Sequence, residues 1–437
     1  MYCGKQKLNI KVAHNTPTDI AAKVILLVLI LRGINISFFS VVAFALALTY
    51  IIFSDNENGV CCMFFLLPFA NVFKLNPTGS SFFTYLTIVL ALKLIVKKQK
   101  IEKRFLILWM LLFAIQVVGC NLNLGTLIKQ ASVLLLVYGY FHCCKNITKQ
   151  IVLNFGIGVL ISCFVANMTS IFSNLHAYLR VVRAYEISLD TYRFTALYSD
   201  PNYLAKTLIV LCISLFVLIQ QKAISPKYYV LIALLIGFGF QTISKSFFLM
   251  LIVMVILFFA ISIRTRHWGV SLAITLFCAI VVVLFMYGRI SVFDSFFERI
   301  TSTNDVTTGR MEIWKDYISV IFSNPINLLF GFGIGSTPKY MAHNTYLELL
   351  YTYGIFGSLT FIAGLKYAFG NKIRRGEFAN WAPAIADIIM VFFISSLVSF
   401  DFGFNLILIL SFIAKDSNKQ IEECSEKIYD NGGCSGL

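Results

Sequence analysis

Charged side chains are scarce in this sequence. Only 13% of its residues are Asp, Glu, Lys or Arg, whereas a soluble globular domain carries about 25%. Hydrophobic residues make up 58%, and apolar runs of roughly 18 or more residues recur along the whole chain. This composition excludes a separate soluble domain and predicts a single transmembrane domain over residues 1–437.

Patterns that accompany several other protein classes are also missing. No cysteine spacing typical of a metal site occurs among the eleven cysteines. The apolar runs are continuous, which excludes the alternating segments of a membrane β-barrel. The first run lacks the small-residue cleavage site of a signal peptide, and no internal repeat occurs. We therefore predict an all-α, polytopic membrane protein with about 12 to 14 transmembrane helices.

The predicted helices follow the apolar runs. They span residues 18–32, 35–53, 59–74, 80–97, 105–119, 126–142, 151–172, 202–220, 227–241, 246–263, 268–287, 345–367, 382–400 and 404–415. Two long polar loops lie between them, at residues 173–201 and 288–345, and a polar tail follows at 416–437.

The net charge of +15 comes from basic residues that cluster in short loops at every second turn of the chain. The positive-inside rule therefore predicts that these loops, both termini and the flexible tail 416–437 are cytoplasmic. The same clustering argues against nucleic-acid binding. The two long loops carry balanced charge and no cysteine, so we predict that they face outside and are not held by disulfide bonds.

The second long loop contains an amphipathic segment. Its apolar side chains recur at helical spacing between residues 310 and 323, at Met311, Trp314, Tyr317, Ile318, Ile321 and Phe322. This spacing predicts a helix that lies on the membrane surface or covers a cavity. Gly331, Gly333 and Gly335 follow at alternate positions, and they suit either close backbone approach to a ligand or an ordinary turn. Gly354 and Gly357, inside the next predicted helix, indicate close helix packing.

Three polar segments follow one another in a fixed order. They are Arg193 with Asp200-Pro201-Asn202, then Ser244-Lys245, and then Arg310, Gly331-Phe332-Gly333, His343-Asn344-Thr345-Tyr346-Leu347 and Gly354-Ile355-Phe356-Gly357. In this order and spacing, residues 193 to 357 resemble the O-antigen ligase and O-antigen polymerase superfamily of bacterial membrane glycosyltransferases. The chain departs from that pattern at Lys245, where the family usually has arginine. Lysine keeps the positive charge but lacks the bidentate fork of arginine.

The resemblance implies a GT-C-like enzyme of the bacterial cytoplasmic membrane, with its site facing the outside or periplasm. It implies transfer of an oligosaccharide from polyprenyl pyrophosphate to an acceptor sugar, with inversion at the anomeric carbon. The departing pyrophosphate requires cations, for which Arg193, Lys245 and Arg310 are candidates. The acceptor hydroxyl requires a base, and His343 is the candidate because an ordinary histidine pKa of about 6.5 suits proton transfer at neutral pH.

Other polar residues have both a structural and a functional interpretation. Asn202 either starts a helix or binds substrate, and Asn344 either caps a helix or binds the acceptor. Arg180 and Arg183 bind either sugar or lipid headgroups. No Asp-x-Asp or Asp-x-Glu pattern occurs on the predicted outer side, so we expect metal-independent transfer and no cofactor.

We predict a polymerase that joins polyprenyl-pyrophosphate-linked repeat units into O-antigen or capsular polysaccharide. Its expected partners are the lipid-linked donor, a glycan acceptor and the lipid bilayer, with a flippase and a chain-length regulator beside it. An O-antigen ligase, which transfers the glycan to the lipid A core of lipopolysaccharide, is one alternative. A transporter or flippase of lipid-linked oligosaccharide is an alternative of another class. It predicts internal repeats and broken helices, which the sequence does not show.

Overall fold

The computed structural model describes residues 16–97, 101–118, 124–168, 171–172, 174–178, 193–265, 269, 273, 309–333, 341–369, 377–393 and 401–414. Within these ranges every regular element is a helix, apart from one isolated bridge between Lys74 and Ser81. The predicted all-α class is therefore confirmed. The predicted helix 268–287, the tail 416–437 and large parts of both long loops fall outside the described residues.

The helices agree closely with the apolar runs of the sequence. They are α1 (Pro17–Asn35), α2 (Ser37–Phe53), α3 (Asn56–Leu66), α4 (Phe82–Lys97), α5 (Lys103–Val118), α6 (Leu124–Cys143), α7 (Thr148–Asn167), α9 (Pro201–Gln220), α10 (Tyr229–Gln241), α11 (Lys245–Arg264), α14 (Arg310–Phe322), α15 (Pro325–Phe330), α16 (Thr345–Phe369), α17 (Phe378–Met390) and α18 (Asp401–Ile413), with short 3-10 turns η1 (Leu67–Phe69), η2 (Pro226–Tyr228) and η3 (Val391–Phe393). Helix α3 ends well before the predicted residue 74, because Pro68 lies in the turn that follows it.

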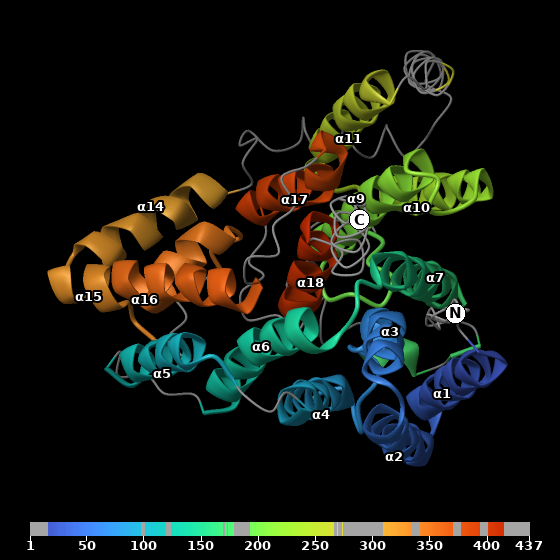
Figure 1. The fold of residues 1–437 in the computed structure, drawn as a ribbon, viewed down its shortest axis with the longest axis horizontal. Helices are drawn as coiled ribbons and strands as arrows, with labels where there is room; N and C mark the ends of the chain where they lie inside the picture. The colour runs from blue at the N-terminus through green and yellow to red at the C-terminus, as the bar shows by residue number, and fades with distance from the viewer. Residues whose placement is uncertain are drawn as a thin grey trace, which may run out of the picture.

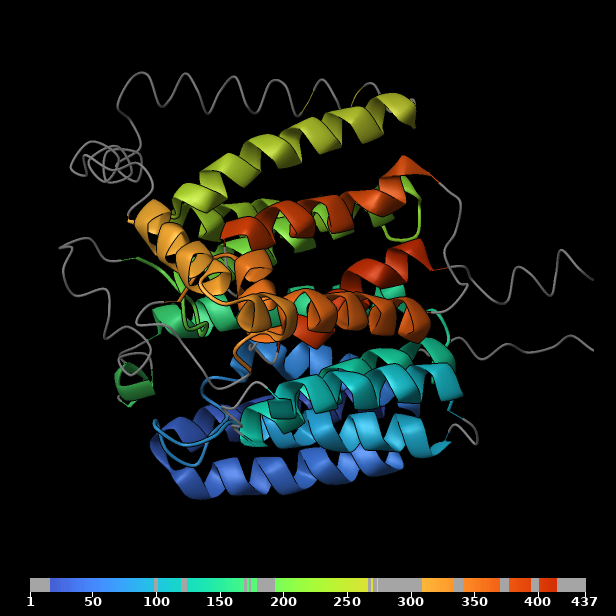
Figure 2. The same cartoon turned by 90° about the vertical axis from the view of Figure 1, so that its left-hand side faces the viewer.

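Four of the described helices, α7, α9, α11 and α16, are long and apolar enough to cross a membrane. Six further apolar stretches of 10–17 residues accompany them. Figure 2 shows the helices side by side, from α1 and α2 (blue) at one edge to α11 (yellow-green) at the opposite edge. The chain is an integral membrane protein with a polytopic helical fold.

Helix α9 is the centre of the packing. In its apolar window 94% of the residues are buried, against 61%, 44% and 39% in α7, α11 and α16. It packs against α7, α10, α11 and α17 (Figure 1). Every residue of α9 except Tyr203 is buried. Packing on all sides therefore holds the helix in place, together with the polar residues of its first turn.

Helix α16 is broken at Gly354, which has φ 62° and ψ −171°, a conformation that is essentially restricted to glycine. The break leaves backbone carbonyls without helical partners. The carbonyl of Tyr351 accepts a hydrogen bond from the Phe332 amide at 2.8 Å, and that of Thr352 accepts one from the Gly333 amide at 3.0 Å. These two amides bind the broken helix, which favours the structural interpretation of this glycine segment. The sequence did not predict this break.

The predicted amphipathic helix is confirmed as α14. Its buried side chains, Tyr317 and Ile321, pack with Ala342 and Tyr351 in a small separate core. Ile313 and Trp314 are half-buried, and Met311, Ile318 and Phe322 are exposed. In Figure 2 this helix (gold) lies obliquely at one end of the bundle. It thus covers the chain on both sides of His343 and leaves an apolar face outward.

Replacement of Gly331 by Ala tests the contact at the break. Gly331 has φ 74°, and a Cβ there would lie 2.5 Å from the Thr352 carbonyl oxygen. We expect Gly331→Ala to cost about 1–3 kcal/mol from backbone strain alone, lowering the thermal unfolding midpoint in detergent by several degrees. The matched control is Gly237→Ala in α10, where a Cβ meets nothing within 4 Å. Equal midpoints for the two variants would contradict the packing described.

Candidate functional site

Four helices begin at the same end of the bundle. Asp200 caps α9, Ser244 caps α11 and the Asn344 side chain caps α16, while α14 begins at Arg310. The first turns of α9 and α11 are joined directly by a side-chain hydrogen bond. Because helix N-termini carry partial positive charge, this end of the molecule favours an anion.

Asn202 is the centre of the hydrogen bonds at the start of α9. Its Oδ1 accepts a hydrogen bond from the Ser244 hydroxyl at 2.6 Å and one from the Arg193 guanidinium at 3.5 Å. Arg193 Nε also donates to the Thr242 carbonyl at 3.3 Å. All of these side chains are buried. Asn202 therefore joins the loop before α9 to the turn before α11, which favours a positioning role over direct substrate binding.

His343 is held by the backbone on either side of it. It has φ 47°, in the left-handed region that non-glycine residues seldom adopt. The Trp314 indole donates a hydrogen bond to the Ala342 carbonyl at 2.8 Å. On the other side, Asn344 Oδ1 accepts from the amides of Tyr346 and Leu347 at 3.0 and 3.1 Å. Asn344 is thus a helix cap, and it fixes where the imidazole leaves the chain.

The pKa shifts of His343 and Arg310 show which charges from distant parts of the chain lie near them. Burial lowers the pKa of His343, the Asp200 carboxylate opposes this effect, and the Arg310 cation adds to it. Burial also lowers the pKa of Arg310, with Asp200 opposing and Arg193 adding to the effect. Asp200 therefore lies within electrostatic range of both His343 and Arg310, and Arg310 lies within range of both His343 and Arg193. A lowered pKa leaves the imidazole neutral at pH 7, with a nitrogen able to accept a proton.

The predicted site residues have different outcomes. The structure brings Arg193, Arg310 and His343 together, and Lys245 directly follows the Ser244 that binds Asn202. Arg180 and Arg183 lie outside the described residues, so their proposed contacts with sugar or lipid stay predictions.

Sequence reasoning missed Asp200. It was seen only as part of a helix start, which it is, since its carboxylate accepts from the Asn202 amide at 2.6 Å. The structure adds that the same charge acts on both His343 and Arg310. The available signal was its place between Arg193 and Asn202, but no local pattern could show its approach to a residue 143 positions later.

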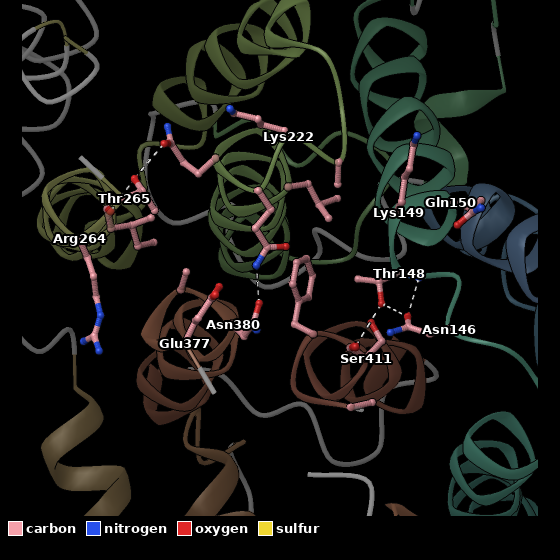
Figure 3. Close-up of a pocket in the computed structure, with 18 residues that line it drawn as sticks. Asn146, Thr148, Lys149, Gln150, Lys222, Arg264, Thr265, Glu377, Asn380 and Ser411 are labelled. Atoms are coloured by element: carbon pink, nitrogen blue, oxygen red, sulfur yellow. Dashed lines mark hydrogen bonds between the residues drawn. The ribbon is translucent and has the colours of Figure 1, made fainter. Parts of the chain in front are cut away.

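A cavity of about 990 Å³ lies at the other end of α9. It is lined by Lys149, Lys222 and Arg264, and by amide and hydroxyl side chains (Figure 3). Those polar groups bind one another; Gln221, for example, donates to Asn380 at 2.6 Å. None of the predicted site residues lines this cavity, so it is not part of the candidate site.

Comparison with protein families gives a match to one segment of the chain. Residues 229–362 match the family model described as O-antigen ligase. Over this segment, which is less than half of the chain, the sequence is similar to the O-antigen ligase family. The match runs from α10 into α16 and includes Ser244, Lys245, Arg310, His343 and Asn344. The match supports a membrane enzyme of the O-antigen ligase and polymerase type.

Two further findings concern the extent of this match. No curated protein and no solved structure was found to match the chain. The half of the site on the first turn of α9, with Arg193, Asp200 and Asn202, lies before the matched segment. Its assignment to the site thus depends on the geometry. Among the described residues, no three His, Cys, Asp or Glu side chains come together as metal ligands.

The neighbours of His343 can be tested by titration. Asp200→Asn removes a negative charge and keeps a good helix cap, so we expect the His343 pKa to fall further. Arg310→Gln removes a positive charge, so we expect the His343 pKa to rise. Histidine-ring NMR in detergent measures both, with the His343 signal assigned by its loss in His343→Gln. His142, which lies 3.7 Å from Glu102, should titrate unchanged; shifts in the same direction for both variants would refute the arrangement.

Proposed function

We propose that the chain is a membrane glycosyltransferase that polymerises polyprenyl-pyrophosphate-linked oligosaccharide repeat units on the outer face of the cytoplasmic membrane. The observation that carries the proposal is the cluster of His343, Arg310, Arg193 and Asp200 at converging helix N-termini. The family match supports the reaction class. A neutral base beside partly exposed and buried cations suits transfer from a pyrophosphate leaving group.

The donor half of the reaction needs stabilisation of a departing pyrophosphate. Arg310 and Lys245 are partly exposed, so both can reach a bound anion. Arg193 is 7% exposed and is bonded to Thr242 and Asn202, so we assign it a supporting charge instead of a first contact. Charge-assisted bonds of this kind, together with the helix dipoles, act most strongly away from bulk water.

The acceptor half needs removal of one proton. His343 would take the proton from the acceptor hydroxyl as its oxygen attacks the anomeric carbon of the donor sugar. The bond from that carbon to the pyrophosphate oxygen breaks, and the pyrophosphate leaves with the electron pair on the opposite side, which inverts the anomeric centre. Asp200 would favour the imidazolium that forms, because its charge stabilises the protonated ring.

Helix α14 would contribute to both the donor side and the acceptor side of the site. It supplies Arg310 at its first residue, and through Trp314 it holds the chain directly before His343. Its exposed apolar face, with Met311, Ile318 and Phe322, suits the membrane interface, where the lipid chain of the donor lies. Base and cation would thus be presented together at the depth of the lipid-linked pyrophosphate.

Removal of the base tests this mechanism most simply. We expect His343→Ala to lower product formation by about 100- to 10,000-fold. The measurement is glycan chain length by gel, with purified full-length protein and lipid-linked repeat unit as the sole substrate. The control is His176→Ala, an exposed histidine in the first long loop, which should keep the parent rate. Full-length product at the parent rate from His343→Ala would exclude His343 as the base.

Donor binding tests the cation assignment separately. We expect the double variant Arg310→Ala and Lys245→Ala to bind polyprenyl pyrophosphate at least tenfold more weakly, because two charge-assisted contacts are lost. Isothermal titration in detergent measures the dissociation constant. Lys227→Ala serves as the control, because it removes an exposed lysine at the turn before α10. Unchanged affinity in the double variant would refute the phosphate clamp.

The match of residues 229–362 to the O-antigen ligase family model supports the ligase alternative. The two functions differ in the acceptor and share the donor chemistry. A ladder of products from lipid-linked repeat units alone supports the polymerase. Product that forms only after lipid A core is added supports the ligase. Transport of intact donor across a vesicle membrane, without any new glycosidic bond, would support a flippase instead.

A further inference from the structure

A buried ion pair lies one turn below the candidate site. Lys206 in α9 and Asp387 in α17 approach to 3.1 Å, with side chains only 2% and 9% exposed. Lys206 is four residues after Asn202, so both side chains lie on the same face of α9. Neither charge is tolerated alone inside an apolar bundle. This pair therefore fixes the position of α17 along the axis of α9.

Helix α17 is also bonded to the other half of the site. The Tyr346 hydroxyl, three residues after His343, donates to the Ile388 carbonyl at 2.8 Å. That carbonyl lies in the last turn of α17, where carbonyl groups lack helical partners. Just beyond it, Phe392 meets the Trp314 ring edge-on with centroids 5.3 Å apart. The end of α17 thus contacts both the helix that follows His343 and the helix that begins at Arg310.

We propose that the Lys206–Asp387 pair is a positioning contact that sets the separation of the two halves of the site through α17. One half is Arg193, Asp200 and Asn202 at the start of α9; the other is Arg310 and His343. The proposal deepens the proposed function and rests on it for its catalytic consequence. Its structural content, the separation of Asp200 from His343, holds independently of any reaction.

Two alternative roles make different demands. A purely structural pair would change stability without changing the geometry above it. If Lys206 contacted the phosphate directly, its replacement would weaken donor binding. Lys206 Nζ makes no hydrogen bond to the described residues, so it has donors for such a contact. Loss of a positioning pair would instead lower kcat, since misplacement by about 1 Å can cost roughly 100-fold, and would weaken the interaction between Asp200 and His343.

The experiment measures the interaction between Asp200 and His343 directly. In the parent, Asp200→Asn changes the His343 pKa by an amount read from histidine-ring NMR. The same change is measured in Lys206→Met with Asp387→Asn, which removes both charges at similar volume. We expect the effect of Asp200→Asn to shrink by at least half, because the two halves separate. The comparison of differences cancels any direct effect of the removed charges on the imidazole.

Matched variants complete the test. Lys23→Met removes another buried lysine, which donates to Asn154 at 2.6 Å in α7, and should leave the interaction unchanged. The exchanged pair, Lys206→Asp with Asp387→Lys, should restore it. If the neutral pair fails to fold, Tyr346→Phe removes the other link to α17 without touching a charge and should also weaken the interaction. An undiminished Asp200–His343 interaction in the folded neutral pair or in Tyr346→Phe overturns the proposal.

Turnover then separates this proposal from the proposed function. If the parent makes no glycan but the interaction weakens as expected, the positioning pair stands and the reaction assignment fails. If the parent is active, kcat in the neutral pair should fall at least tenfold, because Asp200 moves away from His343. A raised KM with parent kcat would identify Lys206 as a binding residue and overturn the positioning role.

Discussion

The polar first turn of α9 is the constraint on which the rest of the site depends. This helix is buried along almost its whole length, and an unsatisfied polar group in such surroundings costs several kcal/mol in the absence of water. Asn202 meets that demand by accepting from Ser244 and Arg193. In doing so it fixes the loop before α9 and the turn before α11 against each other.

The second half of the site depends on a break in helix α16. Gly354 interrupts α16, and the amides of Phe332 and Gly333 take up the carbonyls that the break exposes. That connection holds α15 and its loop on α16, and α14 packs over both. His343 lies between the α14 contact at Ala342 and the Asn344 cap. Helix α17 then links this half to α9, through Tyr346 on one side and Lys206 on the other.

Much of this arrangement could be predicted from sequence because it is local. Continuous apolar runs indicated the helices, and the spacing of Trp314, Tyr317 and Ile321 indicated α14. The order of Arg310 and His343 indicated a site. The approach of Asp200 to His343 and the Lys206–Asp387 pair could not be predicted, because each depends on how distant helices pack. The break at Gly354 was hidden too, since a glycine in an apolar run looks the same whether it serves packing or ends a helix.

The location of the donor pyrophosphate is the most direct test of the account. A cryo-electron microscopy map of the full-length protein with bound polyprenyl pyrophosphate would show it. The account predicts pyrophosphate density within hydrogen-bond distance of Arg310 or Lys245, beside His343 and the first turns of α9 and α11. Density in the cavity at the opposite end of α9, against Lys149, Lys222 and Arg264, with nothing beside Arg310, would contradict it.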